Sequence, residues 1–137
     1  MTVKKLVCAV EHDLDVDAFI ALLADSGLGE RRPIDDRARM AKMLAKADLI
    51  VTARIDGGLV GVARTLSDFA YCSYLADLAV AQRCKGQGIG KALIAETRAR
   101  IGPGSMLLLI AAPAAQGYYE HIGMPRIDSA FLYSREG

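Results

Sequence analysis

The most constraining feature of this sequence is a loop with glycines at alternate positions, Gly86, Gly88 and Gly90, between an apolar segment and an amphipathic one. Residues 74–80 before the loop are typical of a buried strand, and residues 91–101 after it are typical of a helix. Glycines in such a turn let the backbone approach a ligand closely, and the first helical turn adds N–H donors and a partial positive charge. The loop therefore predicts a strand–loop–helix unit that binds a phosphate group.

Two common phosphate-binding motifs do not fit this loop. The P-loop motif needs a glycine five residues before its Gly-Lys pair and a hydroxyl residue after it, where this chain has Lys85 and Ala92. The dinucleotide motif G-x-G-x-x-G needs a third glycine where the chain has Lys91 or Leu93. The basic residues Arg83, Lys85 and Lys91 still favour an anionic ligand, but not one held by either of these motifs.

The loop resembles the acyl-CoA-binding motif of the GNAT (N-acetyltransferase) superfamily, Q/R-x-x-G-x-G/A. When Gly88 and Gly90 are its glycines, the first position is Lys85, which keeps a positive charge without amide or guanidinium geometry. A second frame, from Arg83 to Gly88, matches the motif literally. The continuation Gly-Ile-Gly-Lys-Ala-Leu favours the first frame.

A second segment strengthens this resemblance. Residues 115–124 read A-Q-G-Y-Y-E-H-I-G-M and are similar to the family signature A-x-x-F-Y-E-K-x-G-F, with His121 and Met124 as substitutions. The two segments have the order and the spacing of the family. One departure is Ala112, because the family often has an asparagine seven residues before the tyrosine.

Composition limits the other classes of function. The 137 residues are enough for one domain with its own core, and we expect residues 1–137 to form a single domain. Seventeen basic and sixteen acidic residues leave a net charge of +1, so we expect neither nucleic acid nor a membrane surface as a partner. The start of the chain lacks the hydrophobic centre of a signal peptide. The three cysteines form no CxxC pair, and we therefore expect a cytoplasmic protein with no metal site.

The apolar and turn residues predict the element order βααβββαβαβ. Asp15 is expected to cap the first helix, and Asp35 or Asp36 the second. Strands are expected over residues 3–10, 49–55, 59–66, 74–80, 106–111 and 130–135. This is the GNAT order, and the expected fold is α/β, with three α/β/α layers and a central mixed, mostly antiparallel sheet.

The resemblance implies an enzyme that transfers an acetyl or other acyl group directly from the co-substrate acetyl-CoA to an amine. The glycine loop would hold the pyrophosphate, and the backbone of the fourth strand would pair with the pantetheine arm. The amide of Val80 would then stabilise the charge that develops on the thioester oxygen. The residues that the resemblance assigns to acetyl-CoA are Leu78, Ala79, Val80, Lys85, Gly86, Gln87, Gly88, Ile89, Gly90 and Lys91.

The resemblance also implies two catalytic residues. Tyr119 stands where the family carries a tyrosine that protonates the departing CoA thiolate, although a tyrosine there can also serve packing alone. Asp77, just before the pantetheine contacts, is the first candidate for the base that deprotonates the amine, and its alternative role is to anchor a loop. Asp68 and Glu120 are the other carboxylates considered for the base.

The acceptor is expected to be a small-molecule amine beside the first two helices, between residues 27–34 and 68–74. The apolar segment 130–133 offers a strand edge, and we expect it to support a homodimer. Two other functions stay open. The chain could bind acyl-CoA as a sensor or partner subunit without turnover, which Lys85 and Ala112 favour. It could also be a general nucleotide-binding α/β domain, which the two motif comparisons disfavour.

Overall fold

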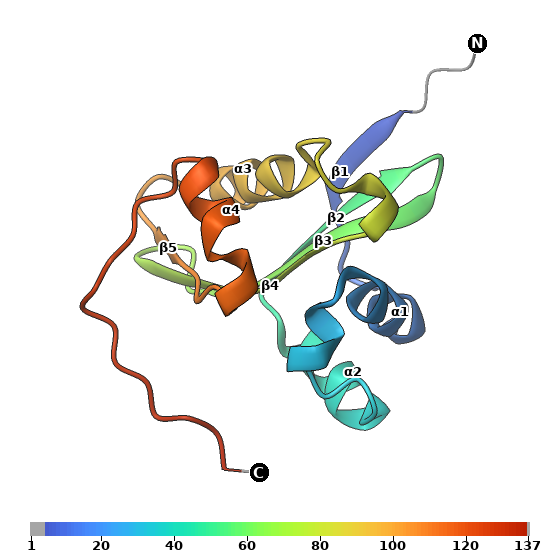
Figure 1. The fold of residues 1–137 in the computed structure, drawn as a ribbon, viewed down its shortest axis with the longest axis horizontal. Helices are drawn as coiled ribbons and strands as arrows, with labels where there is room; N and C mark the ends of the chain where they lie inside the picture. The colour runs from blue at the N-terminus through green and yellow to red at the C-terminus, as the bar shows by residue number, and fades with distance from the viewer. Residues whose placement is uncertain (1–4, 137) are drawn as a thin grey trace.

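A computed structural model describes residues 5–136, which fold around a five-stranded sheet (Figure 1). Its strands are β1 (Leu6–Val10), β2 (Leu49–Ile55), β3 (Gly58–Ser67), β4 (Cys72–Val80) and β5 (Met106–Leu108). Its α-helices are α1 (Val16–Ser26), α2 (Arg37–Lys46), α3 (Ile89–Ile101) and α4 (Gln116–His121). Short 3-10 helices lie at Leu28–Arg31, Gln82–Cys84 and Pro113–Ala115.

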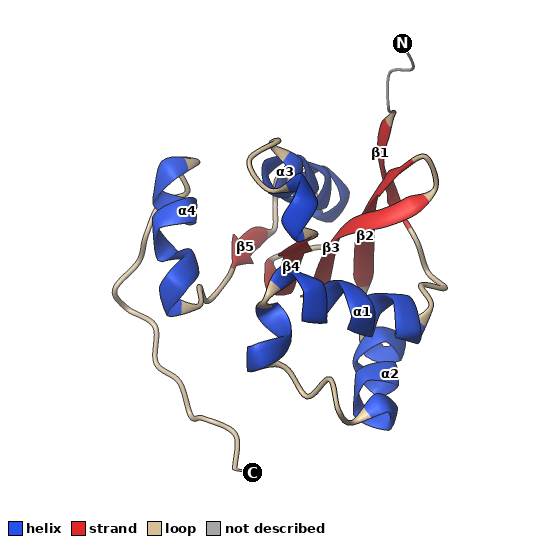
Figure 2. Ribbon diagram, turned by 45° about the vertical axis from the view of Figure 1, so that its right-hand side comes forward, coloured by secondary structure: helices blue, strands red, loops and turns tan. Residues whose placement is uncertain are grey.

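The sheet has the strand order β1-β2-β3-β4-β5, and only β4 and β5 pair in parallel. Figure 2 shows α1 and α2 on one face of the sheet and α3 on the other. The predicted α/β fold, with three layers and a mixed, mostly antiparallel sheet, is confirmed.

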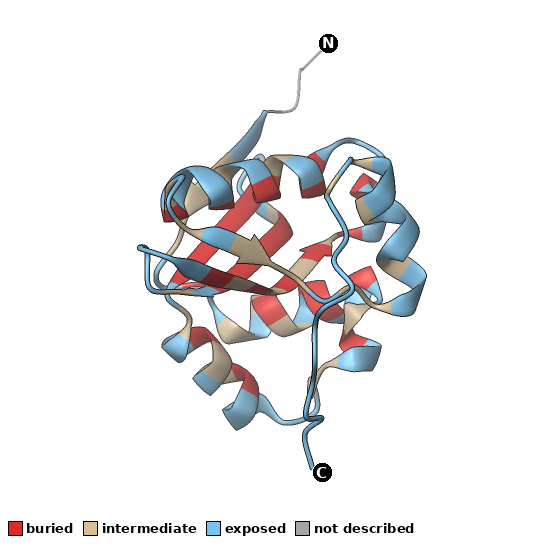
Figure 3. Cartoon of the chain, turned by 90° about the vertical axis from the view of Figure 1, so that its left-hand side faces the viewer, coloured by how far each residue is buried: buried red, intermediate tan, exposed pale blue. Residues whose placement is uncertain are grey.

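Local sequence signals set the ends of the first two helices. The carboxylate of Asp15 accepts a hydrogen bond from the Ala18 amide at 2.9 Å, and α1 ends where Gly27 adopts a left-handed φ of 93°. Asp36 caps α2 in the same way, through the Arg39 amide at 3.1 Å. Figure 3 shows that the buried residues lie mainly on the strands and on the helix faces that cover them.

Two sequence predictions of strands differ from the structure. β5 ends at Leu108, short of residue 111, and the strand expected over residues 130–135 is absent. The side chains of Phe131 and Tyr133 are fully exposed instead. A strand needs a partner for its backbone hydrogen bonds, and residues 122–136 run away from the sheet (Figure 1). For the first strand, predicted over residues 3–10, positions 3 and 4 lie outside the described residues.

An irregularity in β4 shapes the centre of the molecule. The register with β3 passes from Arg64 opposite Asp77 to Thr65 opposite Leu75, so Ala76 is one extra residue on β4. β5 pairs with β4 only along residues 72–74. Residues 75–80 of β4 therefore have no strand partner on the β5 side within the described chain.

No helix among residues 5–136 is long and apolar enough to cross a membrane.

Candidate functional site

The glycine loop has the backbone geometry of an anion-binding turn. Gly86 and Gly88 adopt left-handed φ values of 82° and 79°, which side chains other than glycine rarely tolerate. Gly88 is also the N-cap of α3, and its carbonyl accepts a hydrogen bond from the Ala92 amide at 3.0 Å. The amides of residues 89–91 come before this bond and have no acceptor within the helix. They are therefore free to bind an anion at the positive end of the helix.

The C-terminal end of α1 holds this loop in place. The carboxylate of Asp25 accepts a hydrogen bond from the Gln82 amide, and the ammonium group of Lys85 donates one to the carbonyl of Ser26, both at 2.9 Å. Lys85 thus caps α1 with its side chain, while Gln87 and Lys91 are exposed. Sequence reasoning missed the part played by Asp25, because a hydrogen bond between residues 57 positions apart leaves no local pattern.

Helix α4 brings a tyrosine against the start of α3. A Cβ atom built on Gly90 would overlap the hydroxyl oxygen of Tyr118, so any other residue at this position would require the tyrosine side chain to move. The ring of Tyr118 meets that of Tyr119 edge to face, with centroids 5.2 Å apart. Tyr118 therefore lies beside the glycine loop.

Tyr119 is half-buried and packs against the hydrophobic core. The pKa of its hydroxyl is raised to about 12, chiefly by burial and also by the neighbouring Tyr118, while the positive charge of Arg32 acts to lower it. The hydroxyl therefore carries its proton at neutral pH and is able to donate it. The charge of Arg32 acts on the hydroxyl of Tyr119. The guanidinium of Arg32 also donates a hydrogen bond to the Ala76 carbonyl of β4 at 2.7 Å, so Arg32 lies near both Tyr119 and this strand.

The three strand residues assigned to the pantetheine arm, Leu78, Ala79 and Val80, lie on the part of β4 that β5 leaves unpaired. Leu78 and Val80 are half-buried, and Ala79 is buried. An unpaired strand edge presents backbone N–H and C=O groups, which is what an extended amide-containing arm needs in order to bind by strand-like pairing.

Asp77 is completely buried between two arginines. Its Oδ1 accepts a hydrogen bond from Nε of Arg32 at 2.5 Å, and its Oδ2 accepts one from Nε of Arg64. Both oxygens of the carboxylate are thus occupied by charged donors, and the side chain has no exposed surface from which to reach an amine directly. This geometry favours a positioning role for Asp77 over the role of a base.

Sequence reasoning singled out neither Arg32 nor Arg64. A signal was present, because Arg64 and Asp77 are single charged residues within the apolar runs of two successive predicted strands. Opposite charges in neighbouring buried strands are expected to pair. What the sequence did not reveal is that Arg32, 45 residues before Asp77, joins the same carboxylate.

The other two carboxylates considered for the base are also engaged. Asp68 accepts hydrogen bonds from the amides of Ala70, Tyr71 and Cys72 at 2.8–3.1 Å, and these bonds lower its pKa to about 2. Glu120 is exposed, and its Oε1 lies 3.3 Å from Nη1 of Arg126. A carboxylate with a pKa of about 2 is a poor base at neutral pH.

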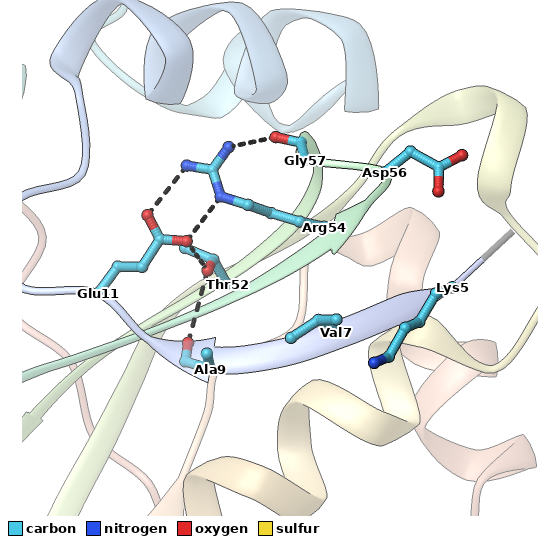
Figure 4. A pocket seen from close by; sticks show the side chains of 8 residues that line it. All are labelled: Lys5, Val7, Ala9, Glu11, Thr52, Arg54, Asp56 and Gly57. Carbon is cyan, nitrogen blue, oxygen red and sulfur yellow. Dashed lines mark hydrogen bonds and ion pairs between the residues drawn. The ribbon is translucent and has the colours of Figure 1, made fainter.

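Two hollows occur elsewhere on the surface. The first is lined by β1, β2 and the β2–β3 turn, at the edge of the sheet opposite β5, and Figure 4 shows that an ion pair between Glu11 and Arg54 lies within it. The second is lined by the turn between β3 and β4 and by β5. It includes Asp68 and Tyr74, from one side of the expected acceptor site, and no residue of 27–34, the other side. Among the described residues, no three side chains of His, Cys, Asp or Glu come together as metal ligands.

The comparison with known families agrees with this geometry. The sequence model of the family described as "Acetyltransferase (GNAT) domain" matches residues 30–133. No curated protein matches the chain at a significant level.

Solved structures share the fold. A probable acetyltransferase of unknown function from meticillin-resistant Staphylococcus aureus has a TM-score of 0.79 at 21% identity, covering 96% of this chain and 100% of that one. An aminoglycoside N-acetyltransferase in complex with CoA has a TM-score of 0.73 at 16% identity, covering 99% and 98%. A ribosomal-protein-alanine N-acetyltransferase from Brucella melitensis biovar Abortus 2308 has a TM-score of 0.69 at 23% identity, covering 96% and 100%.

Proposed function

Because this chain belongs to the GNAT family of acetyltransferases, we propose that it transfers an acetyl group from acetyl-CoA directly to an amine of a small molecule. The observation that carries the proposal is the position of the free amides of residues 89–91, which follow β4 in the chain and lie beside α4 and its tyrosines. Anion-binding amides, an unpaired strand edge and a protonated hydroxyl are the three parts that acetyl-CoA-dependent transfer needs.

Each part has one task in the proposed reaction. The glycine loop binds the pyrophosphate through its backbone amides, with Gly86 and Gly88 allowing the approach. The backbone of residues 78–80 pairs with the pantetheine arm and aligns the thioester, whose oxygen receives a hydrogen bond from the Val80 amide. These contacts hold the acetyl carbon in a fixed position for attack.

The proton transfers follow from the state of the side chains. The free amine attacks the thioester carbon, the C–S bond breaks, and the CoA thiolate takes the hydroxyl proton of Tyr119. The proton lost by the amine passes to solvent, because Asp77 and Asp68 are engaged in hydrogen bonds. Tyr119 then regains its proton from solvent, and the net reaction converts acetyl-CoA and an amine into an amide and CoA.

A small molecule is the acceptor that the surface favours. The hollow beside the β3–β4 turn is open to solvent and has a volume of about 320 Å³, a size that suits a small ligand better than an extended peptide. The fold neighbours do not decide the question, since by name one acts on aminoglycosides and another on a ribosomal protein.

The proposed setting is the cytoplasm, because Cys8, Cys72 and Cys84 are all free thiols. We also propose that residues 1–137 act as one domain.

The second candidate function is a module that binds acetyl-CoA without turnover, favoured by Lys85 using its ammonium group to cap α1. Isothermal titration with acetyl-CoA, CoA and ATP, followed by a screen of amines with detection of the released thiol, separates the two. We expect micromolar binding of acetyl-CoA, no binding of ATP and thiol release that depends on the amine. Binding without release for any amine would favour the module, and binding of ATP alone would overturn both.

A homodimer is also proposed, and its support is the exposed apolar segment Phe131, Leu132 and Tyr133. Large apolar side chains are rarely left exposed together unless a partner covers them. We expect sedimentation at high micromolar concentration to give a dimer. Replacement of Phe131 and Leu132 by serine should convert it into a monomer. A monomer already in the unchanged protein would contradict the proposal.

A further inference from the structure

Two arginines share one buried carboxylate at the irregularity of β4. Arg32 and Arg64 both donate to Asp77, whose side chain is completely enclosed, while those of Arg32 and Arg64 are 22% and 10% exposed. Two guanidinium groups, which keep their charge at any physiological pH, face a single negative charge. The cluster therefore holds one positive charge in excess in a largely water-excluded position.

The hydrogen bonds of the two arginines are unequal. All three nitrogens of Arg32 have an acceptor, since Nε binds Asp77, one terminal nitrogen binds the Arg31 carbonyl, and the other binds the Ala76 carbonyl. Arg64 donates only from Nε, to Asp77. Its two terminal nitrogens have no acceptor among residues 5–136, although the side chain is nine-tenths buried. Among the described residues, the buried side-chain atom without a partner is Oγ1 of Thr65 and not a nitrogen of Arg64, so both terminal nitrogens reach the surface and are accessible to an acceptor on a bound ligand.

The position of the cluster connects it with the reaction. Asp77 directly precedes the strand residues proposed to hold the pantetheine arm, and the charge of Arg32 acts on the hydroxyl of Tyr119. On β3, Arg64 lies two residues before Leu66, which lines the hollow beside the β3–β4 turn. Arg64 thus lies on β3 between Leu66 at this hollow and Ala63, which is opposite Leu78 of the proposed pantetheine site.

We propose that the acceptor is an amine that also carries a carboxylate, and that the two terminal nitrogens of Arg64 bind this carboxylate. The planar fork of a guanidinium matches the two oxygens of a carboxylate, and the bound anion neutralises the excess charge of the cluster. Arg32 and Asp77 are positioning residues, because they hold the Nε side of Arg64 and leave its other side for the ligand. The inference rests on the proposed acetyl transfer and names its class of substrate.

The test compares each of the twenty L-amino acids with its α-carboxamide as acceptor, with acetyl-CoA at saturation and thiol release as the readout. An α-carboxamide lowers the basicity of the amine and so increases the fraction in the reactive free form. This difference alone would make the carboxamide the better acceptor, so a preference for the carboxylate cannot arise from it. We expect at least one amino acid to exceed its carboxamide in kcat/KM by about 10-fold or more, the usual effect of a charge-assisted hydrogen bond. Absence of any such preference would overturn the inference.

Variants identify the residue that carries the preference. Arg64→Gln should abolish it, mainly through KM, while acetyl-CoA affinity measured by titration stays within a few-fold. Arg100→Gln is the matched control, since this exposed arginine pairs only with Glu96 on α3, and it should keep the preference. If Arg64→Gln does not fold, Arg64→Lys retains a charge beside Asp77 without the fork and should raise KM about 10-fold. A preference that survives in Arg64→Gln, or an unchanged KM in a folded Arg64→Lys, would overturn the assignment.

The same experiments separate this inference from the proposed function. Failure of the unchanged protein to bind acetyl-CoA would refute the proposed function itself. Turnover of neutral amines without a preference for carboxylates would refute only the inference about the acceptor.

Discussion

Nε of Arg32 lies 2.5 Å from Oδ1 of Asp77, although the residues are 45 positions apart in the chain. Arg64 donates to the other carboxylate oxygen of Asp77. The two contacts together connect the segment after α1 with the central strands β3 and β4. The buried charges depend on one another, because each would be unpaired without its partner.

Asp77→Asn should therefore destabilise the fold by about 3–5 kcal/mol, since it leaves two guanidinium groups without their shared carboxylate. Urea denaturation measures the change in the free energy of unfolding. The control is Asp17→Asn, which removes an exposed partner of Arg37 and should leave stability unchanged. A variant that retains full stability but loses all turnover would instead assign Asp77 as the catalytic base.

Tyr119→Phe should lower kcat by about 10²-fold, because it removes the proton that the departing thiolate needs. Affinity for acetyl-CoA should stay within a few-fold, since the ring and the glycine loop remain. Stopped-flow or steady-state thiol release measures the effect, with Tyr118→Phe as the neighbouring control. With a pKa of about 12, the hydroxyl keeps its proton up to about pH 11, so Tyr119 should cause no loss of rate between pH 7 and 10. An unchanged kcat in Tyr119→Phe would leave the hydroxyl with a packing role only.

Gly88→Val should weaken acetyl-CoA binding by about 10-fold or more, because a side chain would stand where the phosphate must approach the backbone. The added Cβ meets no protein atom within 4 Å, so the direct effect on the fold is the strain of a φ of 79°, about 1–2 kcal/mol. Gly57→Val is a matched control, with a φ of 83° and equally open space in the β2–β3 turn. If both variants bind acetyl-CoA like the unchanged protein, the loop is not the pyrophosphate site.

Gly90→Ala should destabilise the protein by about 1–3 kcal/mol, because the new Cβ overlaps the Tyr118 hydroxyl at 2.3 Å. Adding Tyr118→Phe should recover part of this loss, since the nearest remaining ring atom is 3.1 Å from that Cβ. Thermal unfolding of the two single variants and the double variant gives the coupling between the residues. Additive effects would contradict the packing of Tyr118 on the start of α3.

Asp68 makes stability depend on pH. Its pKa falls from the ordinary 3.8 to about 2 in the folded chain, because three backbone amides donate to its carboxylate. A lowered folded pKa contributes stability above pH 3.8, and this contribution is lost as the pH falls through about 2. The difference in Tm between the unchanged protein and Asp68→Asn should be constant from pH 7 to 5 and shrink between pH 4 and 2. A constant difference down to pH 2 would show that the charge of Asp68 contributes nothing.

Sequence reasoning succeeded where the interactions are local. The cap at Asp15 and the cap at Asp36 each depend on a few neighbouring residues, and the structure has both of them. The glycine loop belongs to the same class, because its backbone conformation and the helix that follows are set within about ten residues. The prediction of a strand over residues 130–135 was wrong, because an apolar pattern forms a strand only beside an available edge.

The sequence by itself thus determined the order of elements as far as α4, the starts of the first two helices and the turn at the glycine loop, all of which follow from the conformations open to short segments. Only the tertiary structure decided that Ala76 interrupts the register of β4, that Asp77 lies between Arg32 and Arg64, and that Tyr118 rests on Gly90. These features join residues far apart in the chain. They depend on how the strands are aligned and on which polar groups remain unpaired once the core has packed. A short segment of sequence determines neither the alignment nor the unpaired groups.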